Sequence, residues 1–187
     1  MGLNSSPFIA MVEIKLQLKE QTMNRLGISA VLAVTLVFLS SAPVLAGDYD
    51  SALKGVKNFN VVFDYTNGDP VIGNIILKAM ETVDEADEVV ALPNAPQKAI
   101  VIHDAAVFLI TTVRGDRDDA TWAEIQKFQA TLKRMKEKGA TIEVCQYALD
   151  VFEVDRSTVI PEIDQVPNGF VSVVGYQAQD YALIRIP

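Results

Sequence analysis

The sequence is poor in the side chains that carry most nucleophilic and metal chemistry. Its 187 residues include one cysteine, Cys145, and one histidine, His103. A single cysteine excludes a disulfide bond within the chain, so Cys145 is free, or is joined to another chain or to a small thiol. One cysteine and one histidine cannot fill a zinc site without several carboxylates, which disfavours a structural zinc.

The sequence also lacks the short motifs of several large enzyme classes. No Gly-rich phosphate loop is present, because the segment "TNGDP" at 66–70 lacks the Walker spacing. No G-x-S-x-G motif occurs, which argues against a Ser-His-Asp hydrolase. A flavin site inferred from the fold class alone would be an analogy without a supporting residue. We therefore expect no cofactor and no bound metal.

Basic residues are scarce relative to acidic ones. The chain has 16 lysines and arginines against 24 aspartates and glutamates, and a formal net charge of −8. Three of the basic and two of the acidic residues lie in the first 46 positions, so the remainder carries 13 against 22, a net charge of −9. Because such an acidic surface repels nucleic acid and anionic lipid, we expect no nucleic-acid partner.

The beginning of the chain has the layout of a secretory signal peptide. Residues 23–46 combine the positive charge of Arg25, a short apolar run and a small-residue cleavage sequence that ends at Ala46. The apolar run is shorter than the roughly 20 residues that a membrane-spanning helix needs, and Pro43 interrupts its extension. We therefore expect export to the periplasm with cleavage of the signal peptide, so that only this segment meets the membrane.

Two further interpretations concern the same region. An uncleaved N-terminal membrane anchor over residues 26–46 is the alternative to the cleaved signal peptide. Residues 1–22 are unusually long for the start of a signal peptide and carry both charge signs, which indicates a start codon placed too early or an extended leading region. In either case the remaining residues, 47–187, suit one domain with a real core.

Short apolar strands alternate with helical patterns along this domain. The clearest helix covers residues 120–138, since its apolar positions recur on one face, basic residues gather near its end and Gly139 stands where a helix-ending glycine belongs. The patterns predict strands at 59–65, 87–93, 98–103 and 141–145, and helices that begin near 70, 104, 120 and 146. Residues 169–179 suit a strand by propensity and a helix by position, and pattern alone does not decide between them.

This alternation predicts the fold class and the place of the site. Strands joined by helices imply right-handed crossovers, a mainly parallel sheet and helices on both faces. In such sheets the ligands gather at the carboxyl ends of the strands. Residues 64–69, His103 and Cys145 all end predicted strands, so we expect them to share one edge of the sheet.

The order of these segments resembles that of the DsrE/DsrF-like family, the sulfur-relay and related proteins that also include TusD. The resemblance covers roughly residues 58–187 and rests on the strand-ending histidine, the strand-ending cysteine and the pattern at the end of the chain. Four segments carry it: "VVFDYTNGDP", "AIVIHDAAVFLI", "MKEKGATIEVCQYALDVFEV" and "VIPEIDQVPNGFVSVVGYQAQDYALIRIP". Two residues depart from the pattern, Asp104 after the histidine and Asp180 near the end, because glycine is usual at both positions.

The resemblance implies a small three-layer α/β/α sandwich that assembles into trimers or hexamers, and it favours a helix over residues 169–179. It also implies that Cys145 receives sulfur as a persulfide and passes it on, as a carrier between a sulfur donor and an acceptor protein rather than as a turnover enzyme. The run at 105–113 is too apolar for a solvated helix, which also favours a homo-oligomer.

Two hypotheses on function remain open at this stage. In the first, Cys145 carries a persulfide or a mixed disulfide, and its sulfur lies at a helix N-terminus that favours the thiolate while His103 assists. In the second, the chain is a non-catalytic oligomeric binding module of the same fold. A free cysteine is often a buried core residue and a lone histidine is often a hydrogen-bonded strand end, so both residues also have a purely structural interpretation.

Overall fold

The computed structural model describes residues 49–83 and 85–187. The predicted signal peptide, its alternative as a membrane anchor and the early start codon lie outside the described residues. Within the described part, no helix is long and apolar enough to cross a membrane.

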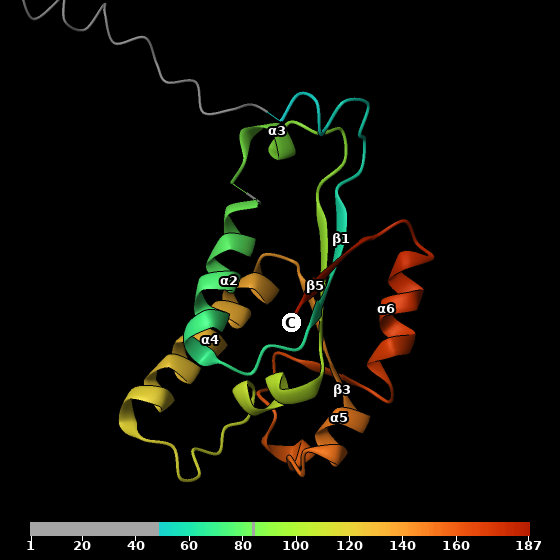
Figure 1. Ribbon diagram of the computed structural model, residues 1–187. Coiled ribbons are helices and arrows are strands. Elements are labelled where there is room, and N and C mark those ends of the chain that lie inside the picture. The colour runs from blue at the N-terminus through green and yellow to red at the C-terminus, as the bar shows by residue number, and fades with distance from the viewer. Residues whose placement is uncertain (1–48, 84) are drawn as a thin grey trace, which may run out of the picture. The chain divides into compact units, whose positions relative to one another are not determined.

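A five-stranded sheet forms the centre of the domain (Figure 1). All of its strand pairs are parallel, and the strand order is β4-β3-β2-β1-β5. The strands are β1 (Asn60–Tyr65), β2 (Gln97–Ile102), β3 (Thr141–Cys145), β4 (Asp164–Val166) and β5 (Ala182–Ile186). The predicted parallel sheet is therefore confirmed, although β4 had no sequence signal that singled it out.

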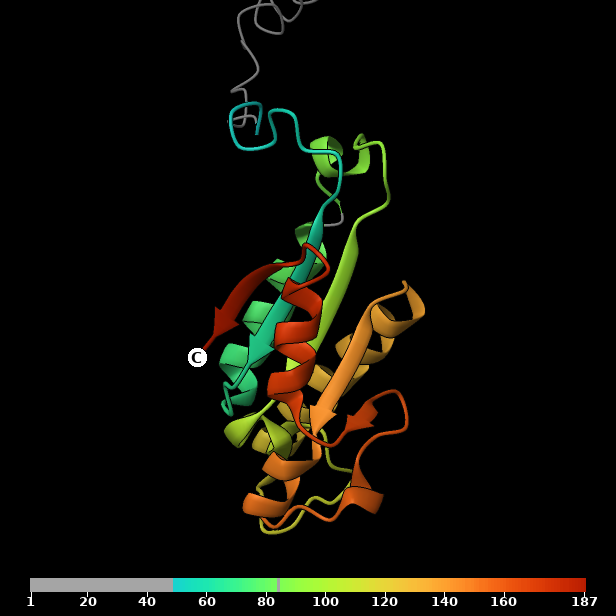
Figure 2. The same ribbon diagram turned by 90° about the vertical axis from the view of Figure 1, so that its right-hand side faces the viewer.

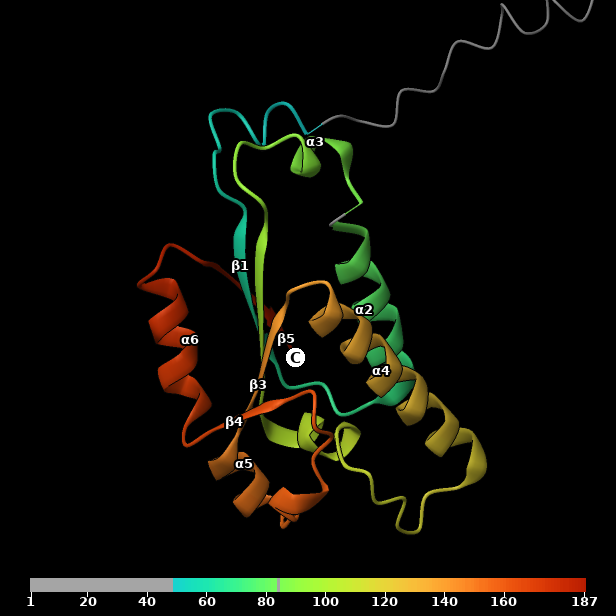
Figure 3. The same ribbon diagram turned by 180° about the vertical axis from the view of Figure 1, so that it is seen from behind.

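Helices cover both faces of this sheet, and the result is the predicted three-layer sandwich. The long helices α2 (Pro70–Val83) and α4 (Asp119–Glu137) lie side by side on one face, and α6 (Gly169–Gln177) lies on the other (Figures 1 and 3). The chain moves in one direction from β1 to β4, so right-handed crossovers place α2 and α4 on the same face. It then returns across the sheet to β5, and this reversal places α6 on the opposite face (Figure 2).

The ends of the long helices follow the sequence signals. The Asp69 side chain accepts the backbone N–H groups of Val71 and Ile72 at 2.8 and 3.1 Å, which caps the start of α2. Asp118 accepts the N–H of Thr121 at 2.7 Å and caps α4 in the same way. Gly139 follows α4 with a φ of +96°, a left-handed conformation that glycine adopts without strain.

The two faces of the sheet have cores of different size. The larger core lies between the sheet and the α2–α4 layer, and residues of alternate strand positions such as Phe63, Ile100 and Ile142 point into it. The smaller one lies under α6 and consists of Val62, Ala99, Val101 and Val173. The start of α6 reaches this face at the carboxyl ends of the strands, where Phe170 packs on His103.

One of the strands predicted from the sequence is absent. Residues 87–93 do not form a strand: Asp87–Val90 is the short helix α3, in which only Val89 is buried. The physical reason is that β2 and β5 already occupy both edges of β1, so no edge next to β1 is left for this segment. Two acidic residues in its first turn also suit a helix N-terminus.

The apolar run at 105–113 does not need a partner chain to cover it. It begins as the 3-10 helix η1 (Asp104–Leu109), and four of its apolar side chains are buried inside the domain. These are Ala106, Val107, Leu109 and Ile110. The argument for an oligomer from this run is therefore wrong, because the run belongs to the larger core.

Candidate functional site

The two predicted site residues lie next to each other at the carboxyl edge of the sheet. Ile102 of β2 pairs with Val144 of β3, so one further step along both strands brings His103 level with Cys145. Neighbouring strands are about 4.8 Å apart. Alternation along the strands turns both side chains to the α6 side, the side that also receives Asp64 of β1. The prediction that these strand ends share one edge is confirmed.

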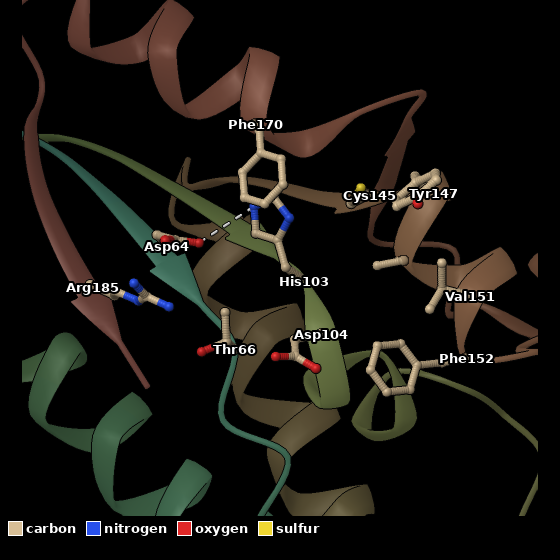
Figure 4. A pocket seen from close by; sticks show the side chains of 11 residues that line it. Asp64, Thr66, His103, Asp104, Cys145, Tyr147, Val151, Phe152, Phe170 and Arg185 are labelled. Atoms are coloured by element: carbon tan, nitrogen blue, oxygen red, sulfur yellow. Dashed lines mark ion pairs between the residues drawn. The ribbon is translucent and has the colours of Figure 1, made fainter.

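A cavity of about 390 Å³ opens at this edge (Figure 4). This volume lies within the range of small-molecule sites, roughly 300–1,000 Å³. The cavity is lined by the carboxyl ends of β1 and β3, by the residues that directly follow β1 and β2, by α5 (Gln146–Val151), by the start of α6 and by β5. Its lining residues are Asp64, Thr66, His103, Asp104, Cys145, Tyr147, Ala148, Val151, Phe152, Phe170 and Arg185.

His103 is 4% exposed, and its only charged neighbour within ion-pair distance in the described part of the chain is Asp64. The Nε2 atom of His103 lies 3.5 Å from Oδ1 of Asp64. Neither atom has a well-aligned hydrogen-bond partner among the described residues. Burial lowers the pKa of His103 below its usual value, and the negative charges of Asp64 and Asp104 oppose that shift without cancelling it. The imidazole is therefore neutral at neutral pH.

The start of α6 packs directly on the His103 ring. The ring of Phe170 stacks on the imidazole with centroids 5.0 Å apart and an angle of 21° between the planes. A Cβ atom on Gly169 would lie 2.4 Å from Cε1 of His103, so only glycine leaves room for the ring. Asn168 caps the helix by accepting the N–H of Phe170 at 3.0 Å.

Cys145 is a free cysteine that is 2% exposed. It stands at the N-terminal boundary of α5, as predicted, but its side chain makes no capping hydrogen bond there. The residue belongs to the larger core where that core continues past the strand end to Ala148 and Leu149 of α5, and it also lines the cavity, so only a small molecule in the cavity can reach it. This position is compatible with both interpretations made from the sequence, a reactive thiol and a buried core residue.

Several lining residues were not predicted from the sequence. Phe170 belongs to a segment with an ambiguous pattern, although "PN" ahead of that segment is a helix-start signal. Arg185 interrupts the apolar strand "ALIRI", and that lone charge was the available signal. It pairs in register with Asp64, which places it on the cavity side of β5.

Asp104 takes an unusual backbone conformation at the mouth of the cavity. Its φ is +50°, in the left-handed region where glycine is the least strained residue. Asp180, the second residue that departs from the family pattern, has a φ of +64°. Both positions therefore keep the backbone shape that glycine would adopt, although an aspartate occupies them.

The fold and the site together define the class of this protein: an all-parallel α/β sandwich with a thiol and an imidazole at adjacent strand ends. The model of the DsrE/DsrF-like family matches residues 55–186, and the chain belongs to that family. No curated protein matches the chain.

Two solved structures are similar to the chain. A protein of unknown function from Methanobacterium thermoautotrophicum has 16% sequence identity and a TM-score of 0.49; the match covers 68% of this chain and 98% of that one. A conserved protein of unknown function from Bacteroides thetaiotaomicron has 17% identity and a TM-score of 0.47; the match covers 70% of this chain and 95% of that one.

Proposed function

We propose that this protein handles sulfur on Cys145, as a persulfide or as a mixed disulfide. The observation that carries the proposal is the meeting of Cys145 and His103 on one side of the sheet, in one cavity at the carboxyl ends of the strands. Family membership supports it, because sulfur relay is a function of the DsrE/DsrF-like family. The protein acts as a carrier rather than as a turnover enzyme.

The chemistry requires a thiolate and an acceptor for its proton. The neutral imidazole of His103 accepts the proton of the Cys145 thiol, and the Asp64 carboxylate stabilises the imidazolium that forms. The thiolate then attacks the outer sulfur of a persulfide, R–S–SH. The new S–S bond forms on Cys145 while the old one breaks, and the leaving R–S⁻ keeps the electron pair.

Intact-protein mass spectrometry tests this proposal. The purified protein is incubated with polysulfide or thiosulfate, and the expected result is a mass gain of one sulfur atom that a thiol reductant reverses. The Cys145→Ser variant, in the same buffer, is expected to gain no mass. Wild-type protein that gains no sulfur from either donor contradicts the proposal. The starting mass also reports where the signal peptide is cleaved.

A non-catalytic oligomeric binding module is the second candidate, and the burial of Cys145 favours it. Alkylation of the folded protein separates the two. In the sulfur-handling case, a small reagent such as iodoacetamide modifies folded Cys145 near pH 6 faster than it modifies a free thiol compound, and His103→Ala slows the reaction. In the binding-module case, Cys145 resists alkylation until the protein is unfolded.

The cellular setting completes the proposal. The signal-like leader supports export to the periplasm, with an N-terminal membrane anchor as the alternative. We place the chain in a homo-oligomer, a trimer or a hexamer. A donor or acceptor protein exchanges sulfur with it through a small molecule that enters the cavity, or after a rearrangement that exposes Cys145. Export adds a constraint, because an unprotected thiol is easily oxidised in that compartment. The near-complete burial of Cys145 limits such oxidation to reagents that fit the cavity.

A further inference from the structure

The mouth of the Cys145 cavity carries one charged group of each sign. Asp104 and Arg185 both line the cavity and are both exposed. In the part of the chain that the structure describes, Arg185 forms no ion pair or side-chain hydrogen bond. The only interaction of the Asp104 side chain there is its electrostatic effect on the pKa of His103. Figure 4 shows the two charged groups on either side of Thr66. Both are therefore available to a ligand that enters the cavity.

The third charged group, Asp64, is less accessible to a ligand than Asp104 and Arg185. Its side chain is 15% exposed and its Oδ1 faces the His103 ring at 3.5 Å. Thr66 is engaged, since its hydroxyl donates a hydrogen bond to the backbone oxygen of Ile186 at 3.0 Å. The recognition of charge at the mouth is thus left to Asp104 and Arg185.

The carboxylate of Asp104 is held at a cost in backbone energy. A non-glycine residue at a φ of +50° is strained by on the order of 1 kcal/mol relative to glycine. Glycine in its place would keep the backbone shape and lose only the carboxylate. Backbone strain often occurs at functional sites, and of the three non-glycine residues with positive φ in the described part of the chain, Asp104 is the one that lines the cavity.

The size of the cavity and the burial of Cys145 limit what can reach the sulfur. Only 2% of Cys145 is exposed, and the cavity in front of it holds about 390 Å³. The folded surface of a partner protein cannot approach a thiol at that depth without rearrangement, whereas a small thiol derivative can. The ligand class is therefore defined by small size, by a reactive sulfur and by two charges of opposite sign.

We propose that the sulfur partner of Cys145 is a small zwitterionic thiol derivative, an amino-acid disulfide or persulfide. Its ammonium group binds Asp104, its carboxylate binds Arg185, and its sulfur lies against Cys145. With a disulfide, the Cys145 thiolate attacks one sulfur atom. One Cys145–S–S–R bond forms, the R–S–S–R bond breaks, and R–S⁻ leaves with the electron pair. This inference rests on the proposed sulfur function, since it names the substrate class of the same cavity.

A series of small disulfides with the same reacting bond tests the charge preference. Cystine is zwitterionic, cystamine carries only ammonium groups, 3,3′-dithiodipropionate carries only carboxylates and bis(2-hydroxyethyl) disulfide is neutral. The rate at which each modifies Cys145 is measured by intact mass and divided by its rate with the neutral thiol N-acetylcysteinamide. We expect the highest ratio for cystine, by roughly three- to tenfold over the neutral disulfide, and a decrease of this preference with added salt.

Two variants separate the two charges. Asp104→Gly keeps the left-handed backbone shape and is expected to lower the ratios for cystine and cystamine while leaving dithiodipropionate unchanged or faster. Arg185→Gln is expected to lower the ratios for cystine and dithiodipropionate while leaving cystamine unchanged or faster. Equal ratios for all four disulfides, or variants without these opposite effects, overturn the inference.

Non-covalent binding keeps the inference testable when Cys145 is unreactive. S-methylcysteine has the two charges and a sulfur atom that cannot exchange, and its binding to the wild-type protein can be followed by calorimetry or chemical-shift changes. We expect binding that weakens in Asp104→Gly and Arg185→Gln. Absence of binding together with a reactive but undiscriminating Cys145 overturns this inference alone. A Cys145 that accepts no sulfur, in a protein that still binds S-methylcysteine, overturns the proposed sulfur function and leaves the recognition of a small zwitterion by Asp104 and Arg185 standing.

Discussion

His103 shows how a single residue acquires its properties from its surroundings. Any histidine has a pKa near neutrality in water, but this imidazole is buried between the sheet and the Phe170 ring. Burial removes water from the charged form more effectively than the two nearby carboxylates replace it, so the pKa of His103 is lowered. A neutral histidine beside a cysteine can accept a proton, whereas a charged one cannot.

The lowered pKa of His103 predicts a pH dependence of stability. The unfolded chain binds a proton on histidine near pH 6.5, while the folded protein binds it only at lower pH. As the pH falls below about 6.5, the free energy of unfolding should therefore decrease, by at most about 1.4 kcal/mol per pH unit from this group.

Urea unfolding at several pH values between about 7.5 and 5.5 measures this decrease. His103→Gln is the control. The free energy of unfolding of the wild type minus that of the variant should decrease as the pH is lowered. A difference that is constant over this range contradicts the prediction.

Tyr65 has a buried hydroxyl group without a hydrogen-bond partner among the described residues. Its side chain is fully buried and its oxygen has no hydrogen bond among the described residues. Burial, together with the charge of Asp69, raises the pKa of the Tyr65 hydroxyl. The unpaired group lowers stability, because it lost its hydrogen bonds to water on folding.

We therefore predict that Tyr65→Phe raises the free energy of unfolding by about 1 kcal/mol. Tyr176→Phe is the matched control, since the Tyr176 hydroxyl donates to Glu143 at 3.0 Å and burial raises its pKa to about 12. Loss of that bond should lower the free energy by about 1 kcal/mol. Chemical denaturation of both variants measures the two changes, and effects of the same sign would contradict the prediction.

At the scale of elements, α6 decides whether the strand ends form a cavity or an open edge. Its first turn is fixed by the Asn168 cap and by Gly169, and it places Phe170 over His103. The rest of the helix packs Val173 on the sheet through the smaller core. The packing of the helix and the shape of the site are thus determined by the same short segment.

Two glycines of α6 give a matched test of this role. Gly169→Ala should lower the free energy of unfolding by about 1–3 kcal/mol, because the new Cβ would overlap the His103 ring. Gly175→Ala should raise it by about 0.5–1 kcal/mol, because nothing lies within 4 Å of its Cβ position and alanine favours a helix.

A double variant assigns the first effect to the ring. In a His103→Ala background the overlap is removed, so most of the cost of Gly169→Ala should disappear. Thermal or urea unfolding of the four proteins completes the cycle. A cost of Gly169→Ala that persists without the imidazole would show that the helix end itself, and not the histidine, requires glycine.

At the scale of the whole molecule, large apolar side chains remain exposed on several elements, among them α6, α2 and β5. Val171 and Val174 of α6 are 71% and 66% exposed, and Ile75 of α2 is 64% exposed. On the edge strand β5, Leu183 and Ile184 are exposed on opposite faces. Edge strands and apolar helix faces of this kind commonly lie in protein interfaces. They replace the buried run at 105–113 as the structural support for an oligomer.

We predict that the domain is a homo-oligomer whose mass in light scattering is a multiple of three chains. Three single substitutions, Ile75→Lys, Val174→Lys and Ile184→Lys, place a charge on α2, α6 and β5 in turn. The one that lies in an interface should reduce the mass while the far-ultraviolet circular dichroism stays unchanged. A wild-type protein that is monomeric at micromolar concentration contradicts this prediction.

Much of the fold could be predicted because its signals are local. Helix α4 could be predicted from its apolar face, its capping Asp118 and the glycine after it, all of which lie within one segment. The parallel sheet followed from the alternation of strands and helices, and the meeting of His103 and Cys145 followed from the rule that parallel strands end at one edge.

What the sequence left open depended on distant partners. Residues 87–93 have a strand-like composition, but both edges of β1 are taken and the segment became α3. The burial of Cys145, the neutral state of His103 and the charges at the cavity mouth arise from segments up to 121 positions away, since Asp64 and Arg185 meet only in the folded sheet. The sequence determined which reactive groups exist and where the strands end; the packing of α6 and β5 around them decided their exposure, protonation and charged neighbours, because these are properties of the surroundings in space.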